Sequence, residues 1–292
     1  MRPAGRPGGG PGAGPGAGPA GGPGGGPGGK SPRRTGVLGG RARDYLHILA
    51  AAAFLIAVWH VASRAVGLEI ILPSPAVTLR RFLRIASTPS FGVSVGTTVG
   101  RGMAGFALAA GLGLACGAAA GLRPALEKLF VPLVTVIRST PVVAFILIAL
   151  IWFDTDVVPV FVTVLMTVPI IYENIVEGIR AVDPRLTELS RAYRVGRRRV
   201  WLRLYLPSLF PFLAAAGRTA LGLTWKVVVA AEVLSLPNLG VGAELQEARY
   251  MLNTAEVFAW TAVAVLLSAV TDLAFALLTR KRRRIAARGA ET

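Results

Sequence analysis

Cysteine and histidine are scarce in this sequence of 292 residues, which has one cysteine and two histidines. Cys116 lies alone in an apolar Gly/Ala-rich run, so neither a disulfide framework nor a cysteine metal cluster is available. His47 and His60 both lie near the first apolar segment, where an interfacial or hydrogen-bonded imidazole is the usual finding. No metal-ligand spacing, nucleophile motif or pair of catalytic carboxylates is recognisable, and this disfavours an enzyme.

Acidic residues are also few, at 15 against 32 lysines and arginines, for a net charge of +17. The basic residues gather in short stretches between long apolar runs, without the interleaved aromatics of a nucleic-acid surface, so no nucleic-acid partner is expected. Apolar residues make up 53% of the chain and the mean hydropathy is +0.58. A soluble domain would leave much of this surface exposed, so the composition favours a multi-pass membrane protein.

The first 43 residues are mostly Gly, Pro and Ala, and we expect them to form a disordered cytoplasmic tail. Residues 24–31 match a phosphate-loop pattern, but a Gly/Pro tract precedes them and Pro32 follows, so the strand and helix of such a loop are missing. We therefore expect no cofactor on this chain. Residues 44–280 are interpreted as the membrane domain and 281–292 as a second basic cytoplasmic tail.

Six apolar segments are long enough for an all-α, polytopic membrane helix bundle. The third is the least certain, and its helix is expected to begin earlier, near Leu129. The predicted spans cover approximately residues 46–63, 102–122, 142–153, 157–175, 209–234 and 257–278. The distribution of Lys and Arg predicts that both termini lie in the cytoplasm.

Two features predict packing and surface structure. Gly113, Gly117 and Gly121 recur at four-residue intervals, which predicts close approach of a second helix backbone. Gly96 and Gly100 share that spacing. Between the first two spans, apolar residues at helical spacing predict a short amphipathic helix on the outer surface. They are Leu79, Phe82, Leu83 and Ala86.

The stretch from Glu188 to Pro207 is strongly basic and lies between the fourth and fifth spans. A segment with six arginines in twenty residues cannot lie in hydrocarbon, so it is interpreted as a cytoplasmic loop. A short helix from Arg185 to about Tyr193 is expected, with Glu188 favouring its N-terminus. The alternative is a basic loop that binds anionic lipid headgroups.

This loop resembles the ATPase-docking loop of type I ABC importer permeases. The similarity also includes Leu72–Pro75, Arg138–Pro141, Trp225–Val233 and Leu239–Gly242, and it points most closely to the nitrate, sulfonate and taurine group. The resemblance implies a permease subunit that pairs with a second copy, a separate ATPase that binds ATP, and an external solute-binding protein. It implies import of a small solute, and basic groups in the spans favour an anion such as a sulfonate, taurine or nitrate.

Carried onto this chain, the family's Glu-Ala-Ala positions become Glu188, Leu189 and Ser190, and its glycine position becomes Arg194. Gly196 is expected to supply the flexible turn instead, and the closing Leu-Pro is Leu206-Pro207. Ala192 and Tyr193 are expected to offer an apolar contact to the ATPase.

Charged residues within the spans are candidates for a translocation pathway, because ionisable groups at this depth usually face a bundle interior or a watery cavity. On the fifth span Arg218, Lys226 and Glu232 fall within one arc of about 120°. Glu173 and Glu177 are expected to pair with Lys226 or Arg180. The pathway candidates are Arg138, Glu173, Arg218, Lys226 and Glu232. A purely structural ion-pair network stays open for these residues, and so does a secondary transporter or channel for the whole protein.

Overall fold

The computed structural model describes residues 37–289, with side chains described from 46 to 279. The chain divides into two units, residues 1–53 and 54–292. The described part of the first unit is the beginning of one helix, which has exposed apolar side chains at Leu46, Ile48 and Leu49. The predicted tail lies outside the described residues from 1 to 36, as does the phosphate-loop match, and so do residues 290–292.

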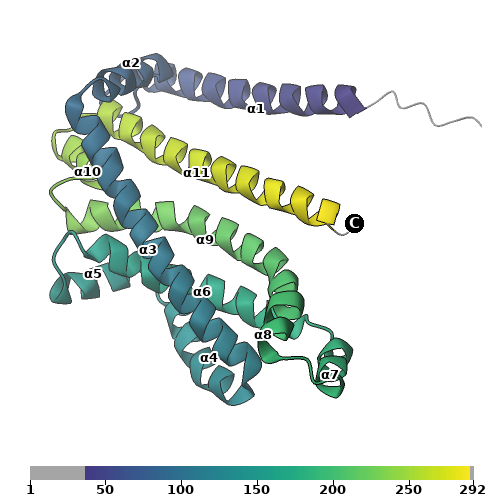
Figure 1. Cartoon of the computed structure of the whole chain (residues 1–292). Helices are drawn as coiled ribbons and strands as arrows, with labels where there is room; N and C mark the ends of the chain where they lie inside the picture. The colour runs from purple at the N-terminus through teal and green to yellow at the C-terminus, as the bar shows by residue number, and fades with distance from the viewer. Residues whose placement is uncertain (1–36, 290–292) are drawn as a thin grey trace, which may run out of the picture. The chain divides into compact units, whose positions relative to one another are not determined.

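Every element in the described part of the chain is helical, as predicted, and no strand occurs there (Figure 1). α1 begins within the predicted N-terminal tail, and α11 ends within the predicted C-terminal tail. The elements are α1 (Val37–Val66), α2 (Pro75–Ala86), α3 (Pro89–Leu122), α4 (Pro124–Ser139), α5 (Val142–Trp152), α6 (Val158–Arg180), α7 (Pro184–Ala192), α8 (Arg197–Val200), the π-helical turn η1 (Trp201–Tyr205), α9 (Leu206–Ser235), α10 (Val241–Tyr250) and α11 (Thr254–Gly289).

Five helices within the described residues are long and apolar enough to cross a membrane, and a sixth span results if α4 and α5 are counted together. The two helices meet at 101° across Thr140 and Pro141, so the single helix expected from Leu129 is wrong. Pro141 has no N–H for the helical ladder and restricts Thr140 to an extended conformation, observed at φ −82° and ψ 129°. The proline that follows Arg138-Ser139-Thr140 therefore divides the third span.

The predicted glycine spacing is confirmed as a contact between α3 and α6. A Cβ added at Gly113, Gly117 or Gly121 would lie 2.8–2.9 Å from Ile171, Ile175 or Ile179 respectively. Only hydrogen in place of a side chain allows the two backbones to approach this closely. Gly96 and Gly100 differ, because nothing lies within 4 Å of a Cβ built at either position.

α9 extends through the centre of the second unit and packs on α6, α11 and α3. Leu209 and Phe212 press against Gly178 of α6, and Phe275 of α11 presses against Gly217. α2 packs on α11. α2 begins where Ser74 caps its first turn. The carbonyl of Pro73, just before this cap, accepts a 3.0 Å hydrogen bond from the indole of Trp59. The helix predicted around Leu79–Ala86 is therefore present, beginning at Pro75.

Candidate functional site: an exposed helix and a buried polar network

α7 is a nine-residue helix without a single buried side chain. Asp183 caps it, and its carboxylate accepts a 2.8 Å hydrogen bond from the backbone N–H of Arg185. Glu188 lies in the middle of the helix, so its expected role at the N-terminus is wrong and Asp183 has that position. The predicted short helix itself is present, from Pro184 to Ala192. A helix this short gains little from its own hydrogen bonds, and none of its side chains is buried, so it depends on a partner for further stability.

The turn after α7 adopts the conformation that its proposed alignment requires. Arg194, at the family's glycine position, has a φ of +48°, in the left-handed region that favours glycine. The backbone N–H groups of Tyr193 and Val195 close the helix on the carbonyls of Leu189 and Ser190. Gly196 has a φ of −58° and does not need to be glycine for conformational reasons. The turn expected at Gly196 is therefore made at Arg194.

One side of α7 is apolar and uncovered. Leu186, Leu189 and Tyr193 are 48%, 53% and 76% exposed, and their spacing of three and four places them on one helix face. They border an apolar hollow of about 290 Å³, completed by residues of the following turn and helix, among them Val195 and Val200. Glu188 lies on the other side of the helix at 100° per residue. We call Leu186, Leu189 and Tyr193 the α7 face.

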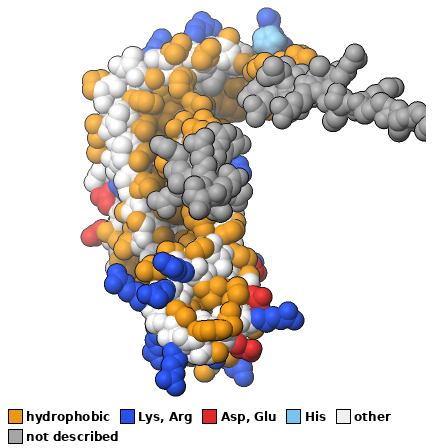
Figure 2. All heavy atoms as spheres, turned by 45° about the vertical axis from the view of Figure 1, so that its right-hand side comes forward, with side chains coloured by type: hydrophobic (Ala, Val, Ile, Leu, Met, Phe, Trp, Pro, Cys, Tyr) orange, Lys and Arg blue, Asp and Glu red, His pale blue; other side chains and the backbone are white. Residues whose placement is uncertain are grey.

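Arginines surround the α7 face. A second hollow of about 660 Å³ lies next to the first, and Arg191, Arg194 and Arg197 contribute to its lining. In the space-filling view, basic side chains gather around the lower end of the molecule, with apolar surface between them (Figure 2). An apolar patch framed by charge can bind an apolar partner surface while the charges select its orientation. Leu206 and Pro207 begin α9 directly after this segment.

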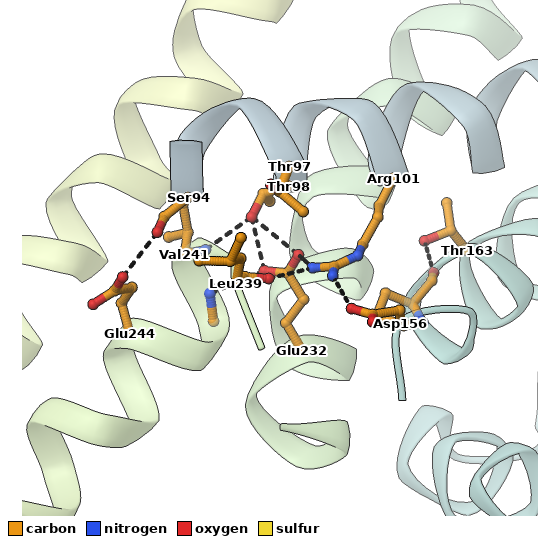
Figure 3. A network of polar contacts seen from close by, with 12 residues as sticks. Ser94, Thr97, Thr98, Arg101, Asp156, Thr163, Glu232, Leu239, Val241 and Glu244 are labelled. Carbon is orange, nitrogen blue, oxygen red and sulfur yellow. Dashed lines mark hydrogen bonds and ion pairs between the residues drawn. The ribbon is translucent and has the colours of Figure 1, made fainter. Parts of the chain in front are cut away.

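At the other end of α9, Glu232 is completely buried in a polar network (Figure 3). Its carboxylate lies 2.8 and 3.0 Å from the hydroxyl of Thr98, and one oxygen accepts a 3.0 Å hydrogen bond from the backbone N–H of Gly242. Arg101 donates to the same carboxylate at 2.8 Å. A buried carboxylate needs such partners, because an unpaired charge there costs several kcal/mol.

Arg101 extends the network to two further segments. Its guanidinium donates to the backbone carbonyl of Leu239 at 2.6 Å and forms an ion pair with Asp156, in the connection between α5 and α6. The hydroxyl of Thr98 also accepts a 2.8 Å hydrogen bond from the backbone N–H of Val241. One cluster therefore joins α3, α9, the start of α10 and the α5–α6 connection.

The Leu239-Gly240-Val241-Gly242 string has a clear physical basis in this network. A Cβ at Gly242 would lie 2.5 Å from both the Cβ of Glu232 and the carbonyl oxygen of Val229. Gly240 has a φ of +145°, which side-chain-bearing residues rarely adopt. The two glycines let the chain pass directly over the carboxylate of Glu232, and this brings the N–H of Gly242 within hydrogen-bonding distance.

Sequence reasoning missed Arg101 because the second span was expected to begin at residue 102. A recognisable signal was present, since an arginine between Gly100 and Gly102 at the edge of an apolar run needs an acidic partner. Glu232 is one of the pathway candidates, and the structure places it under α3 and α10 rather than on an open surface. In this conformation its carboxylate is buried among these partners, and its role in the pathway stays a prediction.

Three of the remaining pathway candidates lie in two other places. Arg138 of α4 forms an ion pair with Glu173 of α6, and Arg218 of α9 forms a two-bond pair with Asp272 of α11 at 2.9 and 3.0 Å. The pairing expected between Glu173 or Glu177 and Lys226 or Arg180 is wrong, because Arg180 pairs with Glu127 and Glu173 with Arg138. Partner choice depended on the packing of α4, which periodicity does not define.

Residues 108–284 match the family model of the binding-protein-dependent transport system inner membrane component. This match covers more than half of the chain. The chain belongs to this family. It is similar to the aliphatic sulfonates transport permease protein SsuC of Escherichia coli, at 31% identity over 77% of this chain and 86% of SsuC. It is also similar to the nitrate import permease protein NrtB of Synechococcus elongatus, at 27% identity over 72% of this chain and 78% of NrtB.

Among solved structures, an amino acid ABC transporter matches with a TM-score of 0.54 at 18% identity, covering 70% of this chain and 97% of that one. This likeness concerns the fold and confirms the ABC importer permease architecture. Membership of the family confirms the predicted transport subunit of an ATP-driven importer, rather than an enzyme, in the inner membrane. ATPase and solute-binding partners follow from the binding-protein-dependent type of the system.

Proposed function

We propose that this permease subunit imports a small anion, with a sulfonate-like or nitrate-like solute as the preferred class, and that the α7 face docks the ATPase. The names of the sulfonate and nitrate permeases support the solute class. The observation that carries the docking role is the exposed apolar face of a capped helix that has no buried side chain. ATP is bound by the partner, and no cofactor is assigned to this chain.

In this proposal two copies of the chain form the pathway, and both termini lie in the cytoplasm. The α7 end of α9 carries the arginine-rich segment, which supports a cytoplasmic location by the distribution of positive charge. The Glu232 network then lies at the extracytoplasmic end, where the solute-binding protein delivers the solute. Movement of α7 with the ATPase is transmitted along α9, since η1 and α9 follow the loop without interruption.

Co-purification of the ATPase subunit tests the docking role. We expect that the ATPase no longer co-purifies with Leu189→Asp, because a carboxylate on the α7 face would be desolvated in the contact without a partner. Arg185→Ala changes an exposed residue of the same helix outside the α7 face and is expected to retain the ATPase. Both proteins should insert into the membrane normally, as judged by size-exclusion chromatography.

Normal recovery of the ATPase with Leu189→Asp would overturn the docking role. A basic loop that binds only lipid would behave in this way, and its binding to anionic vesicles would instead fall on removal of Arg191 and Arg197. Solute uptake by the chain without any ATPase would overturn the ATP-driven function and favour a secondary transporter or channel.

A further inference from the structure

Lys226 stands apart from the other pathway candidates. Among the described residues, Arg138, Arg218 and Glu232 each form an ion pair, and Lys226 forms none. Its side chain is exposed, although it lies on α9 between Arg218 and Glu232. At 1.5 Å per residue it is about 14 Å from the end of α9 at Ser235, well inside a hydrocarbon core of about 30 Å.

The helix face from Ala215 to Lys226 does not have the composition of a lipid-facing surface. We define the α9 stripe as the exposed or half-exposed residues of this side between these two positions, which are Ala215, Arg218, Thr219, Gly222 and Lys226. At 100° per residue they fall within an arc of about 100°. Beyond Lys226, the half-exposed Val229 and Val233 continue the same side towards Ser235. Thr224, on the opposite side of the helix, and Trp225, on its flank, are covered because both pack against Gly102 of α3.

Other exposed faces of the chain differ sharply from the α9 stripe. α11 exposes Val265, Leu266, Val270 and Leu273, each at 51–62%. Such large aliphatic side chains are suited to contact with lipid tails, whereas an unpaired ammonium at the same depth is costly there. The α9 stripe also borders a hollow of about 480 Å³ whose lining includes Arg218 and Thr219.

The net charge of the α9 stripe indicates which solutes it can bind. Arg218 is neutralised by Asp272 of α11, so Lys226 leaves the stripe with one uncompensated positive charge. We infer that the α9 stripe lines the water-filled pathway and that Lys226 is a specificity-determining residue, whose ammonium contacts the anionic group of the solute. This inference rests on the proposed permease function, and it distinguishes Lys226 from the four other pathway candidates.

Charged thiol reagents test this inference on the complete transporter, with its ATPase and binding protein, in proteoliposomes. The sole cysteine is first removed as Cys116→Ala, and Gly222→Cys is introduced one turn from Lys226, where a Cβ meets nothing within 4 Å. Leu266→Cys, at a similar depth on α11, is the control for a lipid-facing position. A sulfonate-bearing and a trimethylammonium-bearing methanethiosulfonate are compared, with and without ATP.

We expect both reagents to modify the cysteine at 222 and neither to modify the one at 266, because these reagents react in water. Adding Lys226→Gln should lower the ratio of the anionic to the cationic rate about tenfold. This value follows from a unit charge about 6 Å away in a water-like dielectric, which attracts one reagent and repels the other. Lys226→Arg should keep the ratio within about twofold. Uptake of ethanesulfonate and nitrate is expected to fall with Lys226→Gln and to persist with Lys226→Arg.

Three results would overturn the inference. Modification at 222 with an unchanged ratio after Lys226→Gln would exclude the anion contact. Disulfide formation between two copies at 222, without modification, would make the α9 stripe an interface between copies. Lack of reaction of the cysteine at 222 with either reagent, both with and without ATP, would show that this position does not face water. Recovery of the ATPase is measured in the same samples, so failure of the docking role is separated from failure at Lys226.

Discussion

Glu232→Ala is expected to destabilise the permease strongly. The substitution leaves the guanidinium of Arg101, whose side chain is 10% exposed, without its buried partner, and it removes the acceptor for Thr98 and for the N–H of Gly242. Breaking a buried ion pair by removing one partner typically costs about 3–5 kcal/mol. For a domain of this size the midpoint of thermal unfolding should fall by about 10 °C.

The measurement is the temperature at which half of the detergent-purified protein leaves the monodisperse peak. Glu247→Ala is the matched control, because Glu247 is exposed on α10 and its loss should shift the midpoint by less than about 2 °C. A double-mutant cycle with Arg101→Met should give a coupling energy above about 1 kcal/mol. The reasoning is refuted if Glu232→Ala behaves like Glu247→Ala, or if the two substitutions are additive.

Three further predictions concern the loop and the helix packing. Arg194→Gly should relieve about 1 kcal/mol of backbone strain and slow hydrogen exchange in peptides of residues 184–196 about fivefold. Gly196→Ala is the control and should leave the exchange rate unchanged. Equal effects of the two substitutions would contradict the assignment of the turn to Arg194. Asp183→Ala should lower the stability of α7 by about 1 kcal/mol and weaken binding of the ATPase subunit about fivefold, as measured by titration. Unchanged affinity would show that the cap is dispensable. Gly117→Val should prevent recovery of folded protein in size-exclusion chromatography, because the valine side chain would meet Ile175 of α6. Gly111→Val is the control and should be recovered normally. Equal recovery of the two proteins would exclude the close contact between α3 and α6.

The helical fold was predictable because span length and glycine spacing are properties of the sequence alone. Apolar runs of about 20 residues indicate membrane helices in any arrangement, and the stripe from Gly113 to Gly121 requires a close neighbour. The identity of that neighbour, α6, was not predictable, because many apolar helices satisfy the same spacing. The 101° bend between α4 and α5 was not predicted; Pro141 marks its position, and its size depends on tertiary packing.

The candidate sites were predictable to different degrees. The short helix was predictable from its charge and its position between two spans, whereas its capping residue, Asp183, was not identified. Its apolar face includes Leu186, which the family pattern did not indicate. The partner of Glu173 was mispredicted, because its pair with Arg138 depends on how α4 packs on α6. No partner was predicted for Glu232, which pairs with Arg101 of α3. The role of Arg101 appears only when α3 lies across α9.

Photocrosslinking from the α7 face tests the central claim most directly. A benzoylphenylalanine is placed at Tyr193, which is 76% exposed, and in a second protein at Tyr250, which is 63% exposed and lies beyond the opposite end of α9. Irradiation of the assembled transporter should crosslink position 193, and not position 250, to the ATPase subunit. A crosslink to the ATPase from position 250, or products at 193 that contain only lipid, would contradict the account.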